Sequence, residues 1–275
     1  MTTRIALMLF VVFGCLQAWS QGDDSARMNG GPEDSTRSHF VLKVGSLYEQ
    51  GDFGTPDTTR VLFIPTTFRY NGERFDISAT PSFGVIRTSG GVVLIDGTPT
   101  PTNNAPASQT SGMGDTLIKT RLFVTEDGGS ESAVPAISPF FKVKIPTGDP
   151  ARNLSTGSYD YGFGVELDKQ IRSLLLFGDV GYTFIGKVPG LDLRNRPAAS
   201  FGIGTKASKN VTVSGLLDWR RAIVAQTSDP LELVGLVNYK ATANTTVSPN
   251  VFVGLTNGSS TFGVGVEFAF KFGRY

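Results

Sequence analysis

Apolar residues occupy every second position through residues 262–272, near the end of the chain. One set of alternate positions holds only Phe and Val, and the set between them holds Gly, Ala, Glu267 and Lys271. A period of two places successive side chains on opposite faces of a β-strand. The stretch therefore predicts a strand with one wholly apolar face and one face of glycine and charge.

The same period of two recurs along the chain from residue 39 onward. We expect about twelve strands from this alternation, each near the roughly 9–11 residues that a tilted strand needs to cross a bilayer. The expected strands are residues 39–49, 59–70, 74–87, 113–125, 135–146, 158–168, 173–184, 197–206, 210–221, 231–241, 245–255 and 260–272. Because a closed barrel has no free edge, the prolines inside these strands are expected near rims or bulges. These prolines are Pro65, Pro81, Pro139 and Pro249.

The connections between the expected strands alternate between long and short. Residues 88–112, 146–157 and 185–196 form long connections, whereas residues 71–73, 169–172, 207–209 and 242–244 form short ones. Apolar and polar residues also alternate along the strands of a soluble sandwich. Long loops on one side and short turns on the other, however, are typical of outer-membrane barrels. The predicted fold class is therefore all-β, an antiparallel up-and-down transmembrane β-barrel of about 12 strands in residues 39–275. An even strand number and a long first connection place both termini in the periplasm.

The first twenty residues have the features of a secretory signal peptide. Residues 1–4 carry a positive charge, residues 5–13 are uninterrupted apolar sequence, and Ala18-Trp19-Ser20 is a cleavage site of small residues around Trp. Cys15 follows a loose lipoprotein box, so lipidation at this residue is the alternative. Residues 21–38 are polar, rich in Gly and Pro and without periodicity, which predicts a disordered periplasmic segment.

The residue inventory excludes several classes of site. The formal net charge is +1, without a block of Lys and Arg, so no nucleic-acid partner is expected. One Cys and one His, His39, exclude a thiolate or multi-histidine metal site, and we expect no metal, no cofactor and no catalytic residue. Gly202–Ala207 matches a loose dinucleotide fingerprint, but its strand context favours a curved glycine-rich strand. Asp149 follows a Pro-Thr-Gly sequence, which is more typical of a turn than of a cation site.

The polar faces of the expected strands carry charges of both signs. Pairs of carboxylates such as Asp160 with Glu166, or Asp218 with Glu232, have the residue types of an acid–base dyad. Lys and Arg on neighbouring strands instead favour a network of paired charges inside the barrel. The predicted lumen-lining residues are Arg121, Lys142, Lys144, Glu166, Asp218, Arg220 and Glu267.

The last strand is similar to the recognition signal of bacterial outer-membrane proteins. The residues that carry the likeness are Gly265, Phe268, Phe270 and the terminal aromatic Tyr275, which is one residue out of phase with the Phe set. The likeness implies the barrel-assembly machinery as a partner.

Several short stretches, taken in order, resemble one bacterial family. They are Gly112-Met113-Gly114-Asp115 opening a strand, the segments 142–149, 154–161 and 181–186, and residues 254–260 before the last strand. Together they are similar to the family named for the MetA-pathway of phenol degradation. This resemblance implies an outer-membrane barrel that acts as a transporter, with possible uptake of aromatic compounds.

The expected function is passive transport of a small molecule, such as an aromatic or hydrophobic compound, through the outer membrane. Its partners would be outer-membrane lipid and the small-molecule solute, and residues 88–112 or the N-terminal segment would gate the lumen. The alternative is a closed structural or surface-interaction barrel without transport activity. An enzyme is not expected, since His39 has no evident nucleophile partner.

Overall fold

The computed structural model describes residues 38–53, 58–88, 92–95, 98–101, 108–130, 132–150, 154–189, 192–225 and 227–273. The predicted signal peptide, Cys15, the polar segment up to residue 37 and Tyr275 lie outside these residues. No helix within the described ranges is long and apolar enough to cross a membrane.

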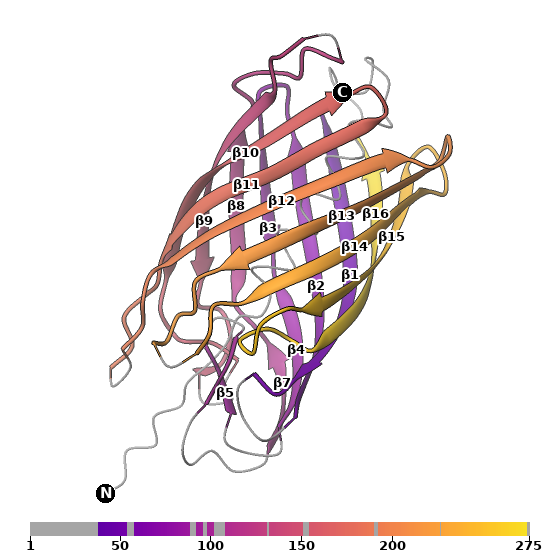
Figure 1. The fold of residues 1–275 in the computed structure, drawn as a ribbon. Helices are drawn as coiled ribbons and strands as arrows, with labels where there is room; N and C mark the ends of the chain where they lie inside the picture. Colours follow the sequence, from indigo (N-terminus) through magenta and orange to yellow (C-terminus); the bar gives the residue numbers. More distant parts are fainter. Residues whose placement is uncertain are drawn as a thin grey trace, which may run out of the picture.

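The described chain forms a closed antiparallel barrel of twelve strands, as predicted (Figure 1). Eight wall strands in the C-terminal part follow one another along the chain. They are β9 (Ala136–Ile145), β10 (Asp160–Ile171), β11 (Leu174–Phe184), β12 (Arg196–Lys206), β13 (Val211–Arg220), β14 (Leu231–Lys240), β15 (Thr245–Gly254) and β16 (Phe262–Phe272).

Four further wall strands come from the N-terminal part, and two of these are interrupted. β1 (His39–Gly51) and β2 (Thr59–Asn71) are continuous. β3 (Phe75–Thr80) with β4 (Ser82–Thr88), and β7 (Ser108–Met113) with β8 (Thr116–Leu122), form one wall strand each, because β3 pairs with β8 and β4 pairs with β7. A separate hairpin of β5 (Val92–Ile95) and β6 (Thr98–Pro101) lies in the connection between β4 and β7.

The first and last strands close the barrel. Phe40 pairs with Phe272, Gln50 pairs with Phe262, and the other edge of β1 pairs with β2. The beginning of β1 and the end of β16 therefore lie at the same end of the barrel. The short turns lie at this end too. In Figure 1 the turns between β10 and β11, β12 and β13, and β14 and β15 are at the same end as the C-terminus.

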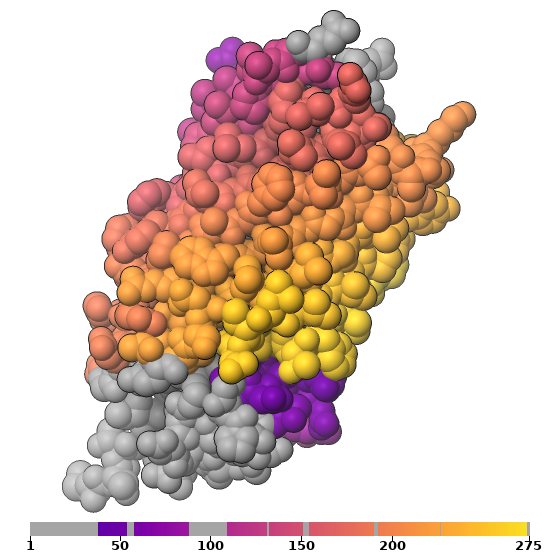
Figure 2. Space-filling model, in the orientation of Figure 1, coloured from indigo at the N-terminus to yellow at the C-terminus, as the bar shows by residue number. Residues whose placement is uncertain are grey.

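Side chains alternate between an apolar outer face and a polar inner face. Phe201, in the middle of β12, exposes 60% of its surface, whereas Ser200 beside it donates a hydrogen bond to Asp179 of β11. In Figure 2 the outer side chains of β11–β16 form a continuous surface. Exposed apolar residues on this face include Phe40, Phe68, Phe141, Tyr161, Phe163, Leu167, Val180, Val213, Leu217, Leu233, Val251, Val264, Phe268 and Phe270.

Each of the four strand prolines lies where a hydrogen-bonded ladder is interrupted. At Pro65 the β1–β2 ladder omits two pairs, and at Pro249 the β14–β15 ladder does the same. Pro81 separates β3 from β4. The regular β8–β9 pairing ends at Phe140, so Pro139 has no partner in that ladder. Because proline has no N–H to donate, these are the positions in a closed wall that tolerate it.

The strand predicted at residues 113–125 differs from the structure at its beginning. The strand begins at Ser108 and contains a bulge at Gly114 and Asp115. Residues 114–116 of this strand lie opposite only two residues, 81 and 82, of the neighbouring strand. The Gly112–Asp115 stretch therefore does not open a strand, because a bulge inserts one extra residue into a continuing strand. The bulge turns Asp115 inward, where its side chain is fully buried.

A charge in the middle of the outer face should destabilise the barrel in lipid. We expect Phe201→Arg to lower the free energy of unfolding by about 2–4 kcal/mol, because an arginine at the bilayer midplane loses its hydration. Ile171→Arg, at the short-turn end of β10, should cost only about 0–1 kcal/mol. Denaturant unfolding in lipid vesicles, followed by Trp219 fluorescence, measures both, and equal effects would contradict a lipid-facing β12.

Candidate functional site: the charged interior of the barrel

The inner face of the barrel concentrates charged side chains of both signs. The structure places all seven predicted residues on this face, each at least nine-tenths buried. They are Arg121, Lys142, Lys144, Glu166, Asp218, Arg220 and Glu267. Within the described ranges, no group of three or more His, Cys, Asp and Glu side chains is arranged to hold a metal ion.

One cluster joins residues of β3, β8 and β10, with β9 lying between β8 and β10. Arg121 forms ion pairs with Asp76 of β3 and, at 2.8 Å, with Glu166 of β10, and Lys119 also pairs with Glu166. These side chains reach across β9 because Ser138, which is small, lies opposite Glu166 in the strand register. Asp76 was missed in the sequence, since nothing local to β3 shows that an arginine lies on the neighbouring strand.

A second cluster lies near the long-loop ends of β13 and β14. Asp218 and Glu232 are directly opposite each other in the register, and Arg220 bonds to Asp218 at 2.6 Å and to Glu232 at 3.1 Å. A guanidinium shared by two carboxylates neutralises their repulsion. This arrangement is the paired network that the sequence favoured over an acid–base dyad.

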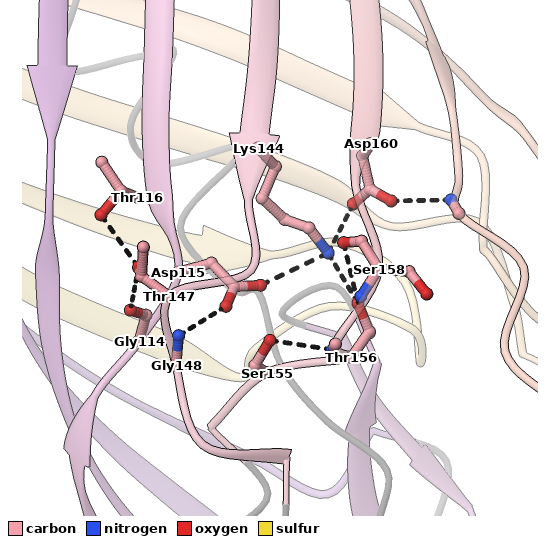
Figure 3. Close-up of polar contacts among 12 residues, drawn as sticks. Gly114, Asp115, Thr116, Lys144, Thr147, Gly148, Ser155, Thr156, Ser158 and Asp160 are labelled. Carbon is pink, nitrogen blue, oxygen red and sulfur yellow. Dashed lines mark hydrogen bonds and ion pairs between the residues drawn. The ribbon is translucent and has the colours of Figure 1, made fainter.

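A third network joins the bulge to two of the long loops (Figure 3). The Lys144 ammonium lies between Asp160, at 2.8 Å, and Asp115, at 3.5 Å, and its side chain is fully buried. Asp115 accepts a hydrogen bond from the backbone N–H of Gly148, and Asp160 accepts one from that of Gly186. Asp160 therefore pairs with Lys144 and not with Glu166.

This network holds residues 146–150 and 154–159 against the inner wall. Thr147 donates a hydrogen bond to the carbonyl of Gly114, and Leu154 is only 1% exposed. A Cβ atom on Gly112 would lie 2.6 Å from the Leu154 side chain, and one on Gly84 would lie in contact with both Leu154 and Phe63. Because Gly84 and Phe63 face inward, the segment folds into the long-loop end of the barrel.

Phenylalanine rings pack against inward-facing glycines around the wall. Phe140 covers Gly164 and Gly181, and a Cβ atom on Gly164 would lie 2.5 Å from its ring. The Lys119 ammonium lies 4.6 Å from the centre of the same ring, which is cation–π distance. Phe177 on Gly202 and Gly204, and Phe252 on Gly263, repeat the arrangement. The interior therefore combines paired charges with aromatic surface.

Other sequence candidates have ordinary structural places. His39 shares a hydrogen bond of 3.0 Å with Asn71 at the short-turn rim. Gly202–Lys206 forms the end of β12 and Ala207 follows it, so the glycine-rich stretch is a strand, as predicted. In β16, Phe268 and Phe270 are each 41% exposed on the outer face, and Gly265 lies on the inner face.

The chain matches the family described as "Putative MetA-pathway of phenol degradation" over residues 35–272. It belongs to this family. No curated protein is similar enough in sequence to count as a relative.

Solved structures share the fold at low sequence identity. The COG4313 outer membrane channel from Pseudomonas putida F1 is 12% identical, with a TM-score of 0.61 over 88% of this chain and 100% of the other. The translocator domain of autotransporter NalP from Neisseria meningitidis is 11% identical, with a TM-score of 0.53 over 98% and 100%. The KdgM porin is 12% identical, with a TM-score of 0.50 over 84% and 99%. This member of the family thus has the fold of outer-membrane channel and translocator proteins.

Removing Arg121 should strongly destabilise the barrel. Arg121→Ala leaves Asp76 and Glu166 buried with less compensating charge, and we expect a loss of about 3–5 kcal/mol in the free energy of unfolding. Arg74→Ala, in the exposed turn before β3, is the matched control and should change stability by less than about 0.5 kcal/mol. Urea unfolding in lipid vesicles measures the free energy of unfolding of both variants. An unchanged free energy in Arg121→Ala would contradict the ion-pair network.

Proposed function

We propose that this family member is a passive outer-membrane channel for small molecules. The observation that carries the proposal is the charged inner face of a closed twelve-stranded barrel. A structure that only has to span lipid gains nothing from so many buried charges, because desolvating each of them costs free energy. The likeness to an outer-membrane channel and a porin supports the same function.

The orientation follows from the loop lengths. Long loops face the exterior and short turns face the periplasm in outer-membrane barrels. Both ends of the barrel sequence, at His39 and Phe272, lie with the short turns, so the proposed location of both termini is the periplasm. Outer-membrane lipid and the barrel-assembly machinery are the partners that this location implies.

The proposed solutes are aromatic or other hydrophobic small molecules. The buried rings of Phe140, Phe177 and Phe252 make part of the inner wall apolar, and the Lys119 ammonium lies 4.6 Å from the centre of the Phe140 ring. Ammonium groups attract the faces of aromatic rings. The family's name points to the same class. Catalysis has no part in this proposal.

Residues 146–150 and 154–159 are the proposed constriction. The sequence pointed to residues 88–112 or the N-terminal segment as a gate. Almost all of the N-terminal segment lies outside the described residues, as do residues 89–91, 96–97 and 102–107 of the other segment. By contrast, the inward fold of residues 146–150 and 154–159 is held by buried contacts of Lys144 and Leu154. Passage would follow the remaining inner wall, past the charged clusters of β8–β10 and β13–β14.

The channel proposal predicts ion conductance by the purified barrel in a planar bilayer. Lys142 is buried on the inner face, so Lys142→Glu should shift the reversal potential in a salt gradient toward cation selectivity. Lys209→Glu, in the exposed β12–β13 turn, makes the same charge change outside the barrel and should leave selectivity nearly unchanged. Absence of conductance, together with absence of liposome swelling by small solutes, would refute the proposal.

Loosening residues 146–150 and 154–159 should widen the channel. Lys144→Met leaves Asp115 and Asp160 buried without their cation, so we expect the segment to leave the inner wall and the single-channel conductance to rise. The triple variant Asp115→Asn, Lys144→Met, Asp160→Asn removes the charges together and should restore a conductance closer to that of the wild type.

Lys187→Met, in an exposed position of the β11–β12 loop, is the control for the loss of one lysine at the same end. Heat-modified migration in gels verifies that each variant folds. If Lys144→Met lowers stability but leaves conductance unchanged, residues 146–150 and 154–159 do not constrict the pathway.

The second candidate function is a closed structural or surface-interaction barrel. The ion pairs that link β3, β8 and β10 along the inner face favour it, because they also suit a lumen filled by side chains. In that case Lys142→Ala and Lys144→Ala would mainly lower stability, whereas in a channel they would change conductance or selectivity.

A further inference from the structure

Two arginines lie directly opposite each other on the outer face of the barrel. Arg60 of β2 and Arg87 of β4 are register partners, and both side chains are exposed. Their chain neighbours Thr59, Val61 and Ile86 are at most 4% exposed, so the alternation places both arginines outside the barrel. Register partners on one face have Cβ atoms about 4.5–5.5 Å apart, and like charges at this separation destabilise a sheet.

The side chains on either side of this arginine pair are uncharged. Gln50 of β1 is the register partner of Arg60, and Gln109 of β7 is that of Arg87. Arg87 donates hydrogen bonds of 2.8 and 3.2 Å to Oε1 of Gln109, which is a neutral acceptor. Asp52 follows the end of β1, and the place keeps a net positive charge even when its single negative charge is counted.

The arginine pair lies at one border of the apolar band of the wall. The next outward residues toward the middle of the barrel are Leu62 and Val85, which are register partners. Tyr70, near the short-turn end of β2, is ten residues from Arg60. That separation is about 33 Å along a strand, or about 25 Å along the membrane normal at a tilt of about 40°. It matches the apolar band of outer-membrane barrels, which is about 25 Å tall.

Aromatic side chains mark both borders of this band. At the long-loop end the rings of Tyr48 and Phe262 are 6.4 Å apart, and the Tyr48 hydroxyl donates a hydrogen bond of 2.9 Å to Oε1 of Gln50. At the short-turn end the rings of Phe40 and Tyr70 are 5.2 Å apart. Aromatic girdles lie at the two membrane–water interfaces of such barrels. The arginine pair, in the same row as Gln50, therefore lies at the level of the lipid headgroups.

We propose that Arg60 and Arg87 bind the phosphate group of a glycolipid in the outer leaflet. A guanidinium presents its N–H donors in a planar fork that binds phosphate bidentately. One phosphate between β2 and β4 would accept hydrogen bonds from both arginines and remove their repulsion. The NH₂ groups of Gln50 and Gln109 are donors for the sugar hydroxyls of such a headgroup.

The rest of the same lipid also has a complementary surface. Leu62 and Val85, which follow the arginine pair toward the middle of the wall, would contact its acyl chains. Recognition of the phosphate headgroup depends on the arginine pair itself. Only the choice of the outer leaflet rests on the proposed orientation, with the long loops at the exterior.

Binding can be measured on the whole barrel without transport. Native mass spectrometry of the detergent-solubilised protein should show one bound lipid A, a glycolipid that carries phosphate monoesters. The same glycolipid without its phosphates should not bind at the same concentration. In the double variant Arg60→Gln, Arg87→Gln the dissociation constant for lipid A should rise at least about tenfold, equivalent to about 1.4 kcal/mol.

The double variant Arg74→Gln, Lys209→Gln is the matched control. It removes two exposed cations in turns at the short-turn end and should leave lipid A binding unchanged. Heat-modified migration verifies that each variant folds. Arg60→Gln alone, which keeps the hydrogen bonds of Arg87 to Gln109, serves if the first double variant fails to fold, and it should also weaken binding.

Several results would overturn the proposed site. They are equal binding of the dephosphorylated glycolipid, an unchanged dissociation constant in the Arg60 variants, or an equal loss of binding in the control variant. Displacement of lipid A by an equal concentration of inorganic phosphate would assign the arginine pair to free phosphate and overturn the lipid headgroup. A barrel that binds lipid A through this pair but conducts no ions would support this site and refute only the channel proposal.

Discussion

The wall of this protein depends on one constraint: lipid offers no hydrogen bonds to a polypeptide backbone. A sheet in a bilayer must therefore pair its first strand with its last, and β1 pairs with β16 along its whole length. The same constraint explains where prolines are tolerated. At Pro65 and Pro249 the ladder to one neighbouring strand has a gap, so the missing N–H removes a bond that the wall does not make there.

Closure also determines what each face of a strand contacts. Outward positions carry Phe, Val, Leu and Tyr that are exposed by a third or more, whereas inward positions carry Lys, Arg, Asp and Glu that are buried. Buried charges are tolerated only where partners lie within a few ångströms. Small inward residues make this possible, because Ser138 lets Arg121 reach Glu166 two strands away, and glycines let phenylalanine rings pack close to the wall.

A single inserted residue connects the wall to the proposed constriction. The bulge at Gly114 turns Asp115 inward, and Asp115 then binds the backbone of Gly148 and faces Lys144. Asp160, on the other side of Lys144, binds the β11–β12 loop through Gly186. One buried lysine thus links a bulge and two long loops, so the shape of the long-loop end and the charge of the interior are coupled.

The sequence by itself determined the fold class, the number of wall strands and the inward or outward direction of most side chains. These follow from the period of two and from loop lengths, which are local properties of the chain. The strict alternation in β16, for example, assigns Phe268 outward and Glu267 inward without knowledge of any neighbouring strand. The match of residues 35–272 to the family confirms the resemblance that short turn motifs had indicated.

Only the tertiary structure decided which charges pair and where the bulge lies. Partners such as Arg121 with Asp76, or Lys144 with Asp115, are set by strand register, which links residues far apart in sequence. The Gly-Met-Gly-Asp stretch interrupts the alternation, but a strand that begins at Asp115 and a strand that bulges there look alike in sequence. The distinction depends on hydrogen bonds that β7 and β8 make with β4 and β3, and these exist only after the barrel has closed.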